Sequence, residues 1–281
     1  MKKYITVAAL LAAGAAFSNA AVDTQLLWGL DFTSNTLGLS TGMGTSVSGD
    51  GTISTTGGAV AGAGSYSTGG TAANILKFTA SGTTSALNKQ TGAFTLSFHA
   101  KWDGASNNQW PVLASFGENN GWCAKVNFSG DSAGNQNIGS SGTYGFAPDG
   151  YNFSGNTRGD VTLDGDWHHF VVTFEGGSES ATLTLYVDGA STATVNWTGA
   201  GLDNDSPMTA FSFGGRLGNT NNNANMSFSD IAVYKGVLAE DQIAYLGSNK
   251  ANASAIPEPS AFGLLAGLGA LALVASRRRR K

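Results

Sequence analysis

Two adjacent histidines are the first side chains whose types and spacing could do chemistry. His168 and His169 could each bind a metal ion or act as a general base. Successive side chains of a β-strand point to opposite faces, so on a strand the two rings could not hold one ion together. We therefore expect one histidine to pack in the core and the other to lie near the surface.

Carboxylate pairs are the second arrangement that could support catalysis. Glycoside hydrolases hold two carboxyl groups about 5 to 9.5 Å apart across the scissile bond. Asp164 and Asp166 alternate suitably, but they flank Gly165, which favours a turn. Three of the four glutamates between residues 21 and 256 fall in a predicted turn or helix: Glu175, Glu179 and Glu240. Because the sequence also lacks a nucleophile elbow, a phosphate loop and a zinc motif, it predicts a non-enzymatic protein.

Aromatic residues in polar surroundings point instead to binding. Saccharide sites place an aromatic ring against the C–H face of a sugar and bind its hydroxyl groups with amides and carboxylates. The segment 107–156 holds such rings among Asn, Gly and Asp, and the candidate glycan-binding residues are Trp110, Trp122, Tyr144 and Tyr151. The alternative for each ring is ordinary packing in a core or a loop.

Oxygen-rich turns could bind Ca²⁺, which prefers carboxylate, amide and carbonyl ligands. The candidate metal ligands are Asp203 and Asp205, which flank Asn204, together with Asp230, which follows the asparagines around Asn221. Surface turns use the same residue types, so turn formation without a metal is the alternative at each position.

Alternating patterns predict the strands that must position these residues. In residues 92–102, Phe94, Leu96 and Phe98 alternate with polar residues, which predicts a strand with one buried face. Residues 41–70 are rich in Gly, Ser and Thr and predict loops and short edge strands, with a continuous linker as the alternative. The spacing in 238–246 predicts one short helix. Further strands are predicted at 26–32, 166–174, 181–187, 191–197, 209–215 and 226–234.

Composition and charge narrow the class of protein. The chain has 40 glycines and only 12% charged residues, and its many short strands show no βαβ alternation. These features predict an all-β, two-sheet antiparallel sandwich. Cys123 is the single cysteine, so an internal disulfide is excluded. Residues 21–256 carry eight basic and eighteen acidic residues, a net charge of −10, which argues against nucleic-acid binding.

Both ends of the chain have the composition of export signals. Residues 1–20 place a basic start before an apolar run and small residues, which predicts a signal peptide cleaved after Ala20; an uncleaved anchor is the alternative. Residues 260–276 are uncharged and would extend about 25 Å as a helix, just enough for a bilayer core of ~30 Å. The basic residues that follow would hold the C-terminus in the cytoplasm.

The C-terminal residues resemble a known sorting signal. Pro257, Glu258 and Pro259 precede the apolar segment, and a basic cluster follows it at Arg277, Arg278, Arg279 and Arg280. This order resembles the PEP-CTERM signal of Gram-negative bacteria. The resemblance implies export by the secretion machinery, a temporary hold in the inner membrane, and processing by an exosortase toward the cell surface, the outer membrane or the extracellular matrix. An ordinary C-terminal anchor behind a proline-stiffened linker is the alternative.

The body resembles a second family. The stretches GAFTLSFHAKW, GDWHHFVVTFEGG, LTLYVDG, FSFGG and FSDIAVYKGVLAEDQI occur in the order found in LamG-like, concanavalin A-like jelly rolls. The chain departs from that pattern at His99, where a tryptophan is common, at Ser229, which replaces an acid beside Asp230, and at Ala239, which replaces a helix-capping serine. The missing acid weakens the transfer of a metal site from the family.

These features together predict four segments: a signal peptide at 1–20, a concanavalin A-like jelly-roll sandwich at 21–250, a linker with the PEP motif at 251–259, and a transmembrane helix with a basic tail at 260–281. We expect an exported, non-catalytic protein of the cell surface or matrix that binds glycan. One alternative is a structural matrix protein without a specific ligand. The other is a glycoside hydrolase whose carboxylates come from separate strands.

Overall fold

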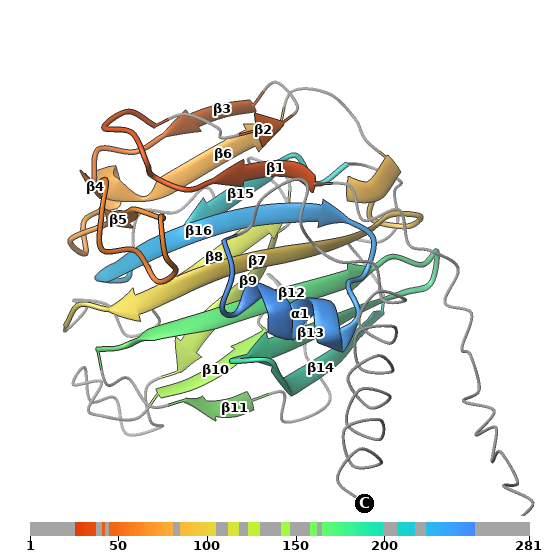
Figure 1. The fold of residues 1–281 in the computed structure, drawn as a ribbon. Coiled ribbons are helices and arrows are strands. Elements are labelled where there is room, and N and C mark those ends of the chain that lie inside the picture. The colour runs from red at the N-terminus through yellow and green to blue at the C-terminus, as the bar shows by residue number, and fades with distance from the viewer. Residues whose placement is uncertain are drawn as a thin grey trace, which may run out of the picture.

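The computed structural model shows two antiparallel β-sheets packed face to face (Figure 1). It describes residues 26–37, 41–42, 45–80, 85–104, 112–117, 123–129, 142–146, 158–161, 165–198, 207–216 and 223–250. The strands are β1 Leu26–Leu30, β2 Thr41–Gly42, β3 Thr45–Ser48, β4 Thr52–Ser54, β5 Ser65–Ser67, β6 Leu76–Ala80, β7 Ala93–Trp102, β8 Val112–Gly117, β9 Cys123–Ser129, β10 Gly142–Phe146, β11 Arg158–Val161, β12 Trp167–Glu175, β13 Ser180–Val187, β14 Ala190–Thr198, β15 Ala210–Phe213 and β16 Met226–Lys235. The helices are α1 Glu240–Leu246 and two short 3-10 turns, η1 Ala72–Asn74 and η2 Ser85–Leu87.

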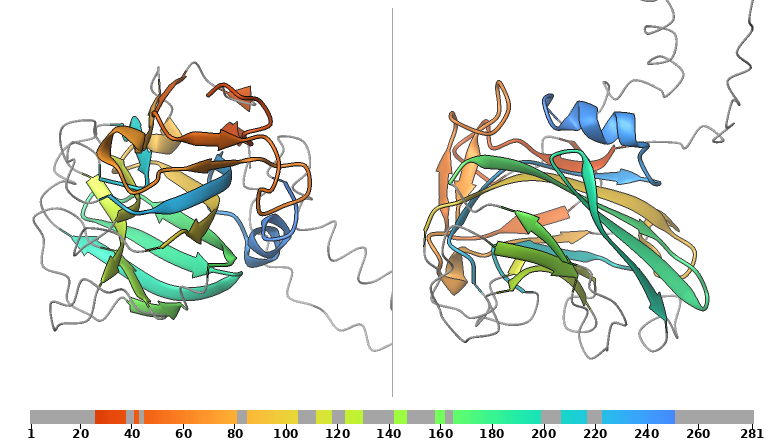
Figure 2. Two further views of the ribbon diagram at one scale, coloured as in Figure 1. Left: turned by 90° about the vertical axis from the view of Figure 1, so that its left-hand side faces the viewer. Right: turned by 90° about the horizontal axis from the view of Figure 1, so that it is seen from below.

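The strand order is that of a two-sheet sandwich with many crossovers. The large sheet runs β14-β13-β12-β7-β16-β1-β2, and β5 pairs with β16 and β4. The small sheet runs β11-β10-β9-β8-β15-β6-β3. Figure 2 shows the large sheet curving around the small one, with α1 on the outer side of the large sheet. The predicted all-β sandwich is confirmed, and the strands predicted from alternation are all present in the described residues.

A cluster of phenylalanine rings joins the two sheets. Phe94 of the large sheet stacks on Phe174 with ring centroids 5.2 Å apart. Across the core it meets Phe116 edge-on at 5.5 Å and Phe211 at 6.1 Å, both from the small sheet. All four side chains are fully buried, as the sequence alternation requires for positions facing the other sheet. Such edge-to-face and offset pairs add to the stabilisation from apolar burial.

The segment 41–70 is part of the sandwich. Within its described residues, β3 pairs with β6 in the small sheet, while β2 and β5 pair with β1 and β16 in the large sheet. The expectation of short edge strands is therefore confirmed, and a continuous linker is excluded for this part of the chain.

The outer face of β7 differs from the prediction. The sequence predicts one buried face, yet Thr95, Ser97 and His99 on the polar face are buried too. The chain between β16 and α1 crosses this face: Thr95 Oγ1 donates to the carbonyl of Gly236 at 2.8 Å and accepts from the backbone N–H of Leu238 at 3.0 Å. These hydrogen bonds explain why polar side chains are stable at positions without solvent contact.

The predicted short helix is present as α1 and packs on the outer face of the large sheet. Ile243 and Leu246 on α1, with Leu238 before it, form an apolar cluster with Val171, Ala232 and Tyr234. Ala239 occupies the N-cap position and has no side-chain acceptor to offer. Gln242 compensates in part, because its Oε1 accepts from the backbone N–H of Ala239 at 3.0 Å.

Restoring a side-chain cap at this position should stabilise the fold. We expect Ala239→Ser to raise the free energy of unfolding by about 0.5–1 kcal/mol, since its hydroxyl can accept from a backbone N–H of the first helical turn. The measurement is the midpoint of urea unfolding. Ala244→Ser, at an exposed position within α1, is the matched control and should give no gain. Equal midpoints for Ala239→Ser and the parent protein would contradict this account of the helix start.

Among the described residues, no helix is long and apolar enough to cross a bilayer. The predicted signal peptide at 1–20 and the predicted transmembrane helix at 260–281 lie outside the described residues.

Candidate ligand-binding site

Most of the site residues that the sequence predicts lie outside the residues that the structure describes. This is so for Trp110, Trp122 and Tyr151, for the metal candidates Asp203 and Asp205, and for the sorting-signal residues Pro257, Glu258, Pro259, Arg277, Arg278, Arg279 and Arg280. The glycan candidate Tyr144 lies in β10, where its backbone pairs with Phe128 and Gly159. These assignments stay predictions.

Asp230, the remaining metal candidate, lies within β16 at an irregular point of the strand. Its φ is +49°, and the register with β7 shifts between Ser229 and Ala232, as at a β-bulge. The side chain is only 1% exposed. Within the described part of the chain, no group of three or more His, Cys, Asp or Glu side chains is placed to hold a metal ion.

Ser229, where the sequence departs from the family pattern, has a structural role here. Its Oγ donates to the carbonyl of Gly64 at 2.8 Å and accepts from the backbone N–H of Ala59 at 3.1 Å. A carboxylate at this position could not donate to Gly64. A Cβ on Gly58 would come within 2.5 Å of the Ser229 hydroxyl, so the glycine permits this close approach. The pair of hydrogen bonds fixes the loop 55–63 on β16.

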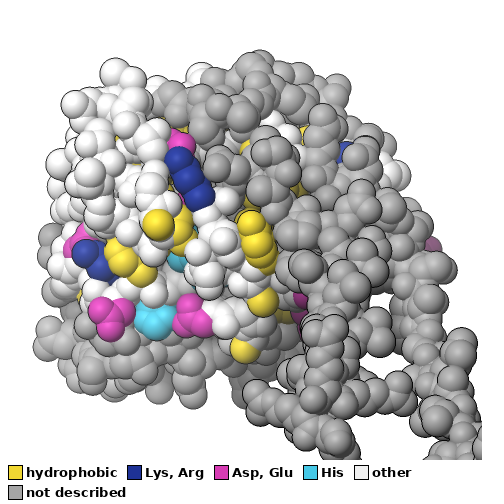
Figure 3. Space-filling model, viewed as in Figure 1, with side chains coloured by type: hydrophobic (Ala, Val, Ile, Leu, Met, Phe, Trp, Pro, Cys, Tyr) yellow, Lys and Arg dark blue, Asp and Glu magenta, His cyan; other side chains and the backbone are white. Residues whose placement is uncertain are grey.

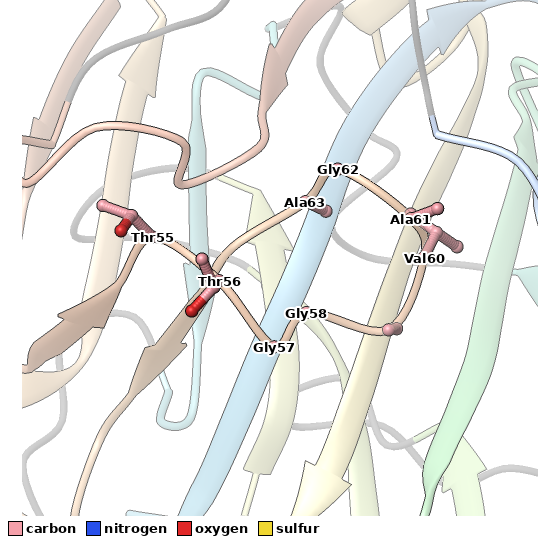
Figure 4. Close-up of a pocket in the computed structure, with 9 residues that line it drawn as sticks. Thr55, Thr56, Gly57, Gly58, Val60, Ala61, Gly62 and Ala63 are labelled. Carbon is pink, nitrogen blue, oxygen red and sulfur yellow. The ribbon is translucent and has the colours of Figure 1, made fainter.

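The loop 55–63 surrounds a shallow hollow of about 320 Å³ (Figure 4). Figure 4 shows the loop in front of β16, with Thr55 and Thr56 on one side and Val60 and Ala61 on the other. The lining consists of backbone, small side chains and these two threonines, without a charged or aromatic group. It therefore offers hydroxyl and backbone groups but neither an aromatic ring on which a sugar could stack nor a charged partner.

The histidines lie on opposite faces of β12, as predicted. His168 is partly exposed, and its Nδ1 lies 2.7 Å from Oδ2 of Asp188. His169 is buried beneath α1, where its ring stacks on His99 with centroids 4.6 Å apart and an interplanar angle of 25°. Nitrogen lone pairs lie in the ring plane, so two stacked rings cannot direct both of them at one ion. The pair is therefore not a chelating site.

Ser97 and His169 have the separation of a nucleophile and its base, with Oγ and Nε2 2.9 Å apart. However, the two side chains are only 1% and 3% exposed, and no described residue bonds to Nδ1 of His169 to orient the ring. Burial, with a smaller effect from the neighbouring His99, lowers the pKa of His169 from 6.5 to about 3. A general base works best with a pKa near the working pH, so we interpret this contact as a buried structural hydrogen bond.

A more accessible constellation lies at one end of the outer face, where β7 ends and β12 and β16 begin. We call it the end cluster, and its members are Ser67, Lys101, Asp103, Trp167 and Ser227. Figure 3 shows charged and histidine side chains gathering at this end of the face. The strand register explains the assembly, because Lys101 pairs with both Trp167 and Ser227, and Ser227 pairs with Ser67.

The end cluster combines an aromatic ring with an organised carboxylate. Asp103 Oδ2 accepts from Ser227 Oγ at 2.5 Å and from Ser67 Oγ at 3.3 Å, and Oδ1 lies 3.7 Å from Lys101 Nζ. Lys101 Nζ also lies 5.4 Å from the centre of the Trp167 ring, within cation–π range. Trp167, Lys101 and Asp103 all keep partial solvent exposure. Unlike the histidine pair, this constellation can be reached by a ligand.

The chain folds as two antiparallel sheets around one aromatic core, and many of the paired strands lie far apart in the sequence. These features define the jelly-roll class of β-sandwich. The family profile of the concanavalin A-like lectin/glucanases superfamily matches residues 77–244, and the chain belongs to this family. A second profile, the PEP-CTERM protein-sorting motif, matches residues 255–280. Both resemblances inferred from the sequence are confirmed, and the motif implies export and sorting to the cell envelope or surface.

Solved structures agree on the fold. The crystal structure of the botulinum neurotoxin serotype G binding domain has a TM-score of 0.53 at 14% identity over 79% of this chain and 50% of that chain. The serotype C1 binding domain has a TM-score of 0.52 at 14% identity over 80% and 52% of the two chains. The serotype D binding domain has the same score and identity over 81% and 51%. The chain thus spans about half the length of these structures. No curated protein sequence matches it.

Proposed function

We propose that this exported surface protein binds a glycan through the end cluster and does not catalyse a reaction. The observation that supports the proposal most is the partly exposed ring of Trp167 beside the fixed carboxylate of Asp103. A sugar can place its C–H face on an indole ring while its hydroxyl groups bond to a carboxylate and an ammonium. The serine hydroxyls on Asp103 limit its rotation, which lowers the entropy cost of binding.

The charges at this end of the sheet favour a neutral glycan. Lys101 is already paired with Asp103, and the exposed Asp166 adds a further negative charge beside Trp167. Residues 21–256 also have a net charge of −10, which repels polyanions at low salt. The proposed ligand is therefore an uncharged polysaccharide.

The family and the sorting motif also support this proposal. The structural neighbours are described as binding domains of botulinum neurotoxins, so the fold supports binding in those proteins. In this proposal, the segment 21–250 is the folded body of the protein. An exosortase processes the C-terminal tail after the protein has been held temporarily in the inner membrane. The product then acts at the cell surface, the outer membrane or the matrix. Ca²⁺ held by Asp203, Asp205 or Asp230 remains part of the proposal.

Loss of the indole ring should weaken binding strongly. We expect Trp167→Ala to reduce affinity for a bound neutral polysaccharide about tenfold, because the ring contact is worth about 0.5–1.5 kcal/mol beyond the area that it buries. Isothermal titration calorimetry on the full-length protein is the measurement. Trp167→Phe should retain part of the affinity, and Tyr186→Ala on the same sheet face, away from the cluster, should retain all of it. Undiminished affinity in Trp167→Ala would place the glycan elsewhere.

A further inference from the structure

The buried histidine pair lies under the last turn of α1 and contacts it directly. His99 Nε2 is 3.4 Å from the carbonyl oxygen of Gly247, the residue that ends the helix. His169 packs behind His99, and its Nε2 bonds with Ser97. Within the part of the chain that the structure describes, neither Nδ1 atom has a hydrogen-bond partner, although each side chain is only 3% exposed. The two neutral rings therefore fill the space between the sheet and the helix end.

Protonation of this pair would place charge where nothing compensates it fully. Each protonated ring must donate from both nitrogens, but neither Nδ1 has a hydrogen-bond partner among the described residues. Two imidazolium rings at 4.6 Å would also repel each other in a medium of low dielectric constant. Water would solvate both charges if α1 left the sheet.

Two interactions oppose the effect of burial on the pKa of His99. The titratable and charged groups on the elements packed around the histidine pair are Lys101 on β7, His168 and Glu175 on β12, Tyr186 on β13, Asp188 in the β13–β14 turn, Asp230, Tyr234 and Lys235 on β16, Glu240, Asp241 and Tyr245 on α1, and Lys250 after α1. The hydrogen bond with the Gly247 carbonyl and the charge of Asp188 both raise the pKa of His99. Burial has the larger, opposite effect, so the pKa of His99 is lowered. The Oδ1 atom of Asp188 also accepts a hydrogen bond from the backbone N–H of His169 at 2.9 Å.

The helix is a small element on the outer side of the large sheet (Figure 2). It has seven residues and packs on the sheet through the apolar cluster around Ile243 and Leu246. Beyond it, Lys250 Nζ bonds to Asp31 Oδ2 at 2.6 Å and to the carbonyl of Gly62 at 3.2 Å. The sorting motif begins at residue 255, so α1 and Lys250 are the last fixed points of the described chain before that motif.

We propose that the His99–His169 pair is an acid-sensitive latch, which holds α1 on the sheet while both rings are neutral and releases it, with the segment that leads to the sorting motif, when the surroundings become acidic. The release is local. The two sheets keep their phenylalanine core, because that core lies between the sheets, whereas His99 and His169 lie on the outer face of the large sheet. The latch thus couples external pH to the accessibility of the segment just before the sorting motif.

Hydrogen–deuterium exchange with mass spectrometry on the full-length protein tests the latch. Labelling times are scaled so that intrinsic exchange is equal at pH 7.5 and pH 4.5. We expect the peptide covering 238–250 to exchange at least about tenfold faster at the lower pH, while peptides from β7 and β12 keep their protection. Equal protection of 238–250 at both pH values would overturn the proposal, and so would a parallel loss of protection in β7 and β12.

Variants separate the latch from general acid effects. His99→Gln with His169→Gln removes both titrating rings, and its exchange at 238–250 should no longer depend on pH. His168→Gln, which changes the partly exposed neighbour, should respond like the parent protein. A response of the double variant equal to that of the parent would refute the assignment. If the double variant does not fold, the single variant His169→Gln should show a reduced response, and an undiminished one would count against the proposal.

Discussion

Replacing Phe94 by alanine is expected to lower the free energy of unfolding by about 3–5 kcal/mol. The ring is fully buried and contacts Phe174 in its own sheet and Phe116 and Phe211 in the opposite sheet. Its removal eliminates apolar burial and three ring contacts at once. Because β7 and β15 are central strands of the two sheets, the remaining rings cannot collapse fully into the cavity.

Chemical unfolding of the purified protein measures this effect. Phe94→Leu retains much of the apolar volume and should cost clearly less than alanine. Thr194→Ala, at an exposed position on the outer face of β14, is the surface control and should stay within about 0.5 kcal/mol of the parent. A loss below about 1 kcal/mol in Phe94→Ala would show that this ring cluster does not hold the sheets together.

Acidification from pH 7 to pH 5 is expected to lower the free energy of unfolding by about 2 kcal/mol through His169 alone. The pKa of this ring falls from 6.5 to about 3 in the folded protein, chiefly because burial opposes its charge. Between these values the unfolded chain binds a proton that the folded chain does not. The stability that neutral His169 contributes is therefore fully present above pH 6.5, and it is lost as the pH falls toward the pKa of His169 in the folded protein. His99, whose pKa is also lowered, adds to the loss in the same direction.

Unfolding curves at several pH values give this dependence directly. His169→Gln should have a flatter stability curve between pH 7 and pH 5 than the parent, whereas His168→Gln should follow the parent. Parallel curves for His169→Gln and the parent would contradict the linkage. Once α1 has been released, both histidines titrate as in the unfolded chain, so the decline should level off at lower pH.

The sequence predicted the strands and the sandwich because burial on one face leaves a period of two residues. Phe94, Leu96 and Phe98 show that period and form one inner row in the structure. The burial of Ser97 and His99 could not be predicted in the same way. Their polarity indicates a solvent-facing row, and the element that covers them, α1, comes about 140 residues later in the chain. Only tertiary packing brings the two together.

The end cluster was also hidden in the sequence, because it depends on strand order. Ser67, Asp103 and Ser227 meet only because β5, β7 and β16 are neighbours in the large sheet. A partial signal was present: Lys101 and Asp103 alternate at the end of one predicted strand, and Trp167 begins the next strand of the sheet. The glycan-binding candidates predicted from the sequence are aromatic residues in 107–156, whereas the aromatic residue of the end cluster lies at the start of β12.

Binding of the full-length protein to a glycan array, with Ca²⁺ and then with a chelator, tests the central claim most directly. The account predicts reproducible binding to one or more neutral glycans and a loss of that signal in Trp167→Ala on the same array. Loss on chelation would add an ion to the site. The absence of binding across a diverse array, or binding that is unchanged in Trp167→Ala, would contradict the claim that the end cluster is a glycan site.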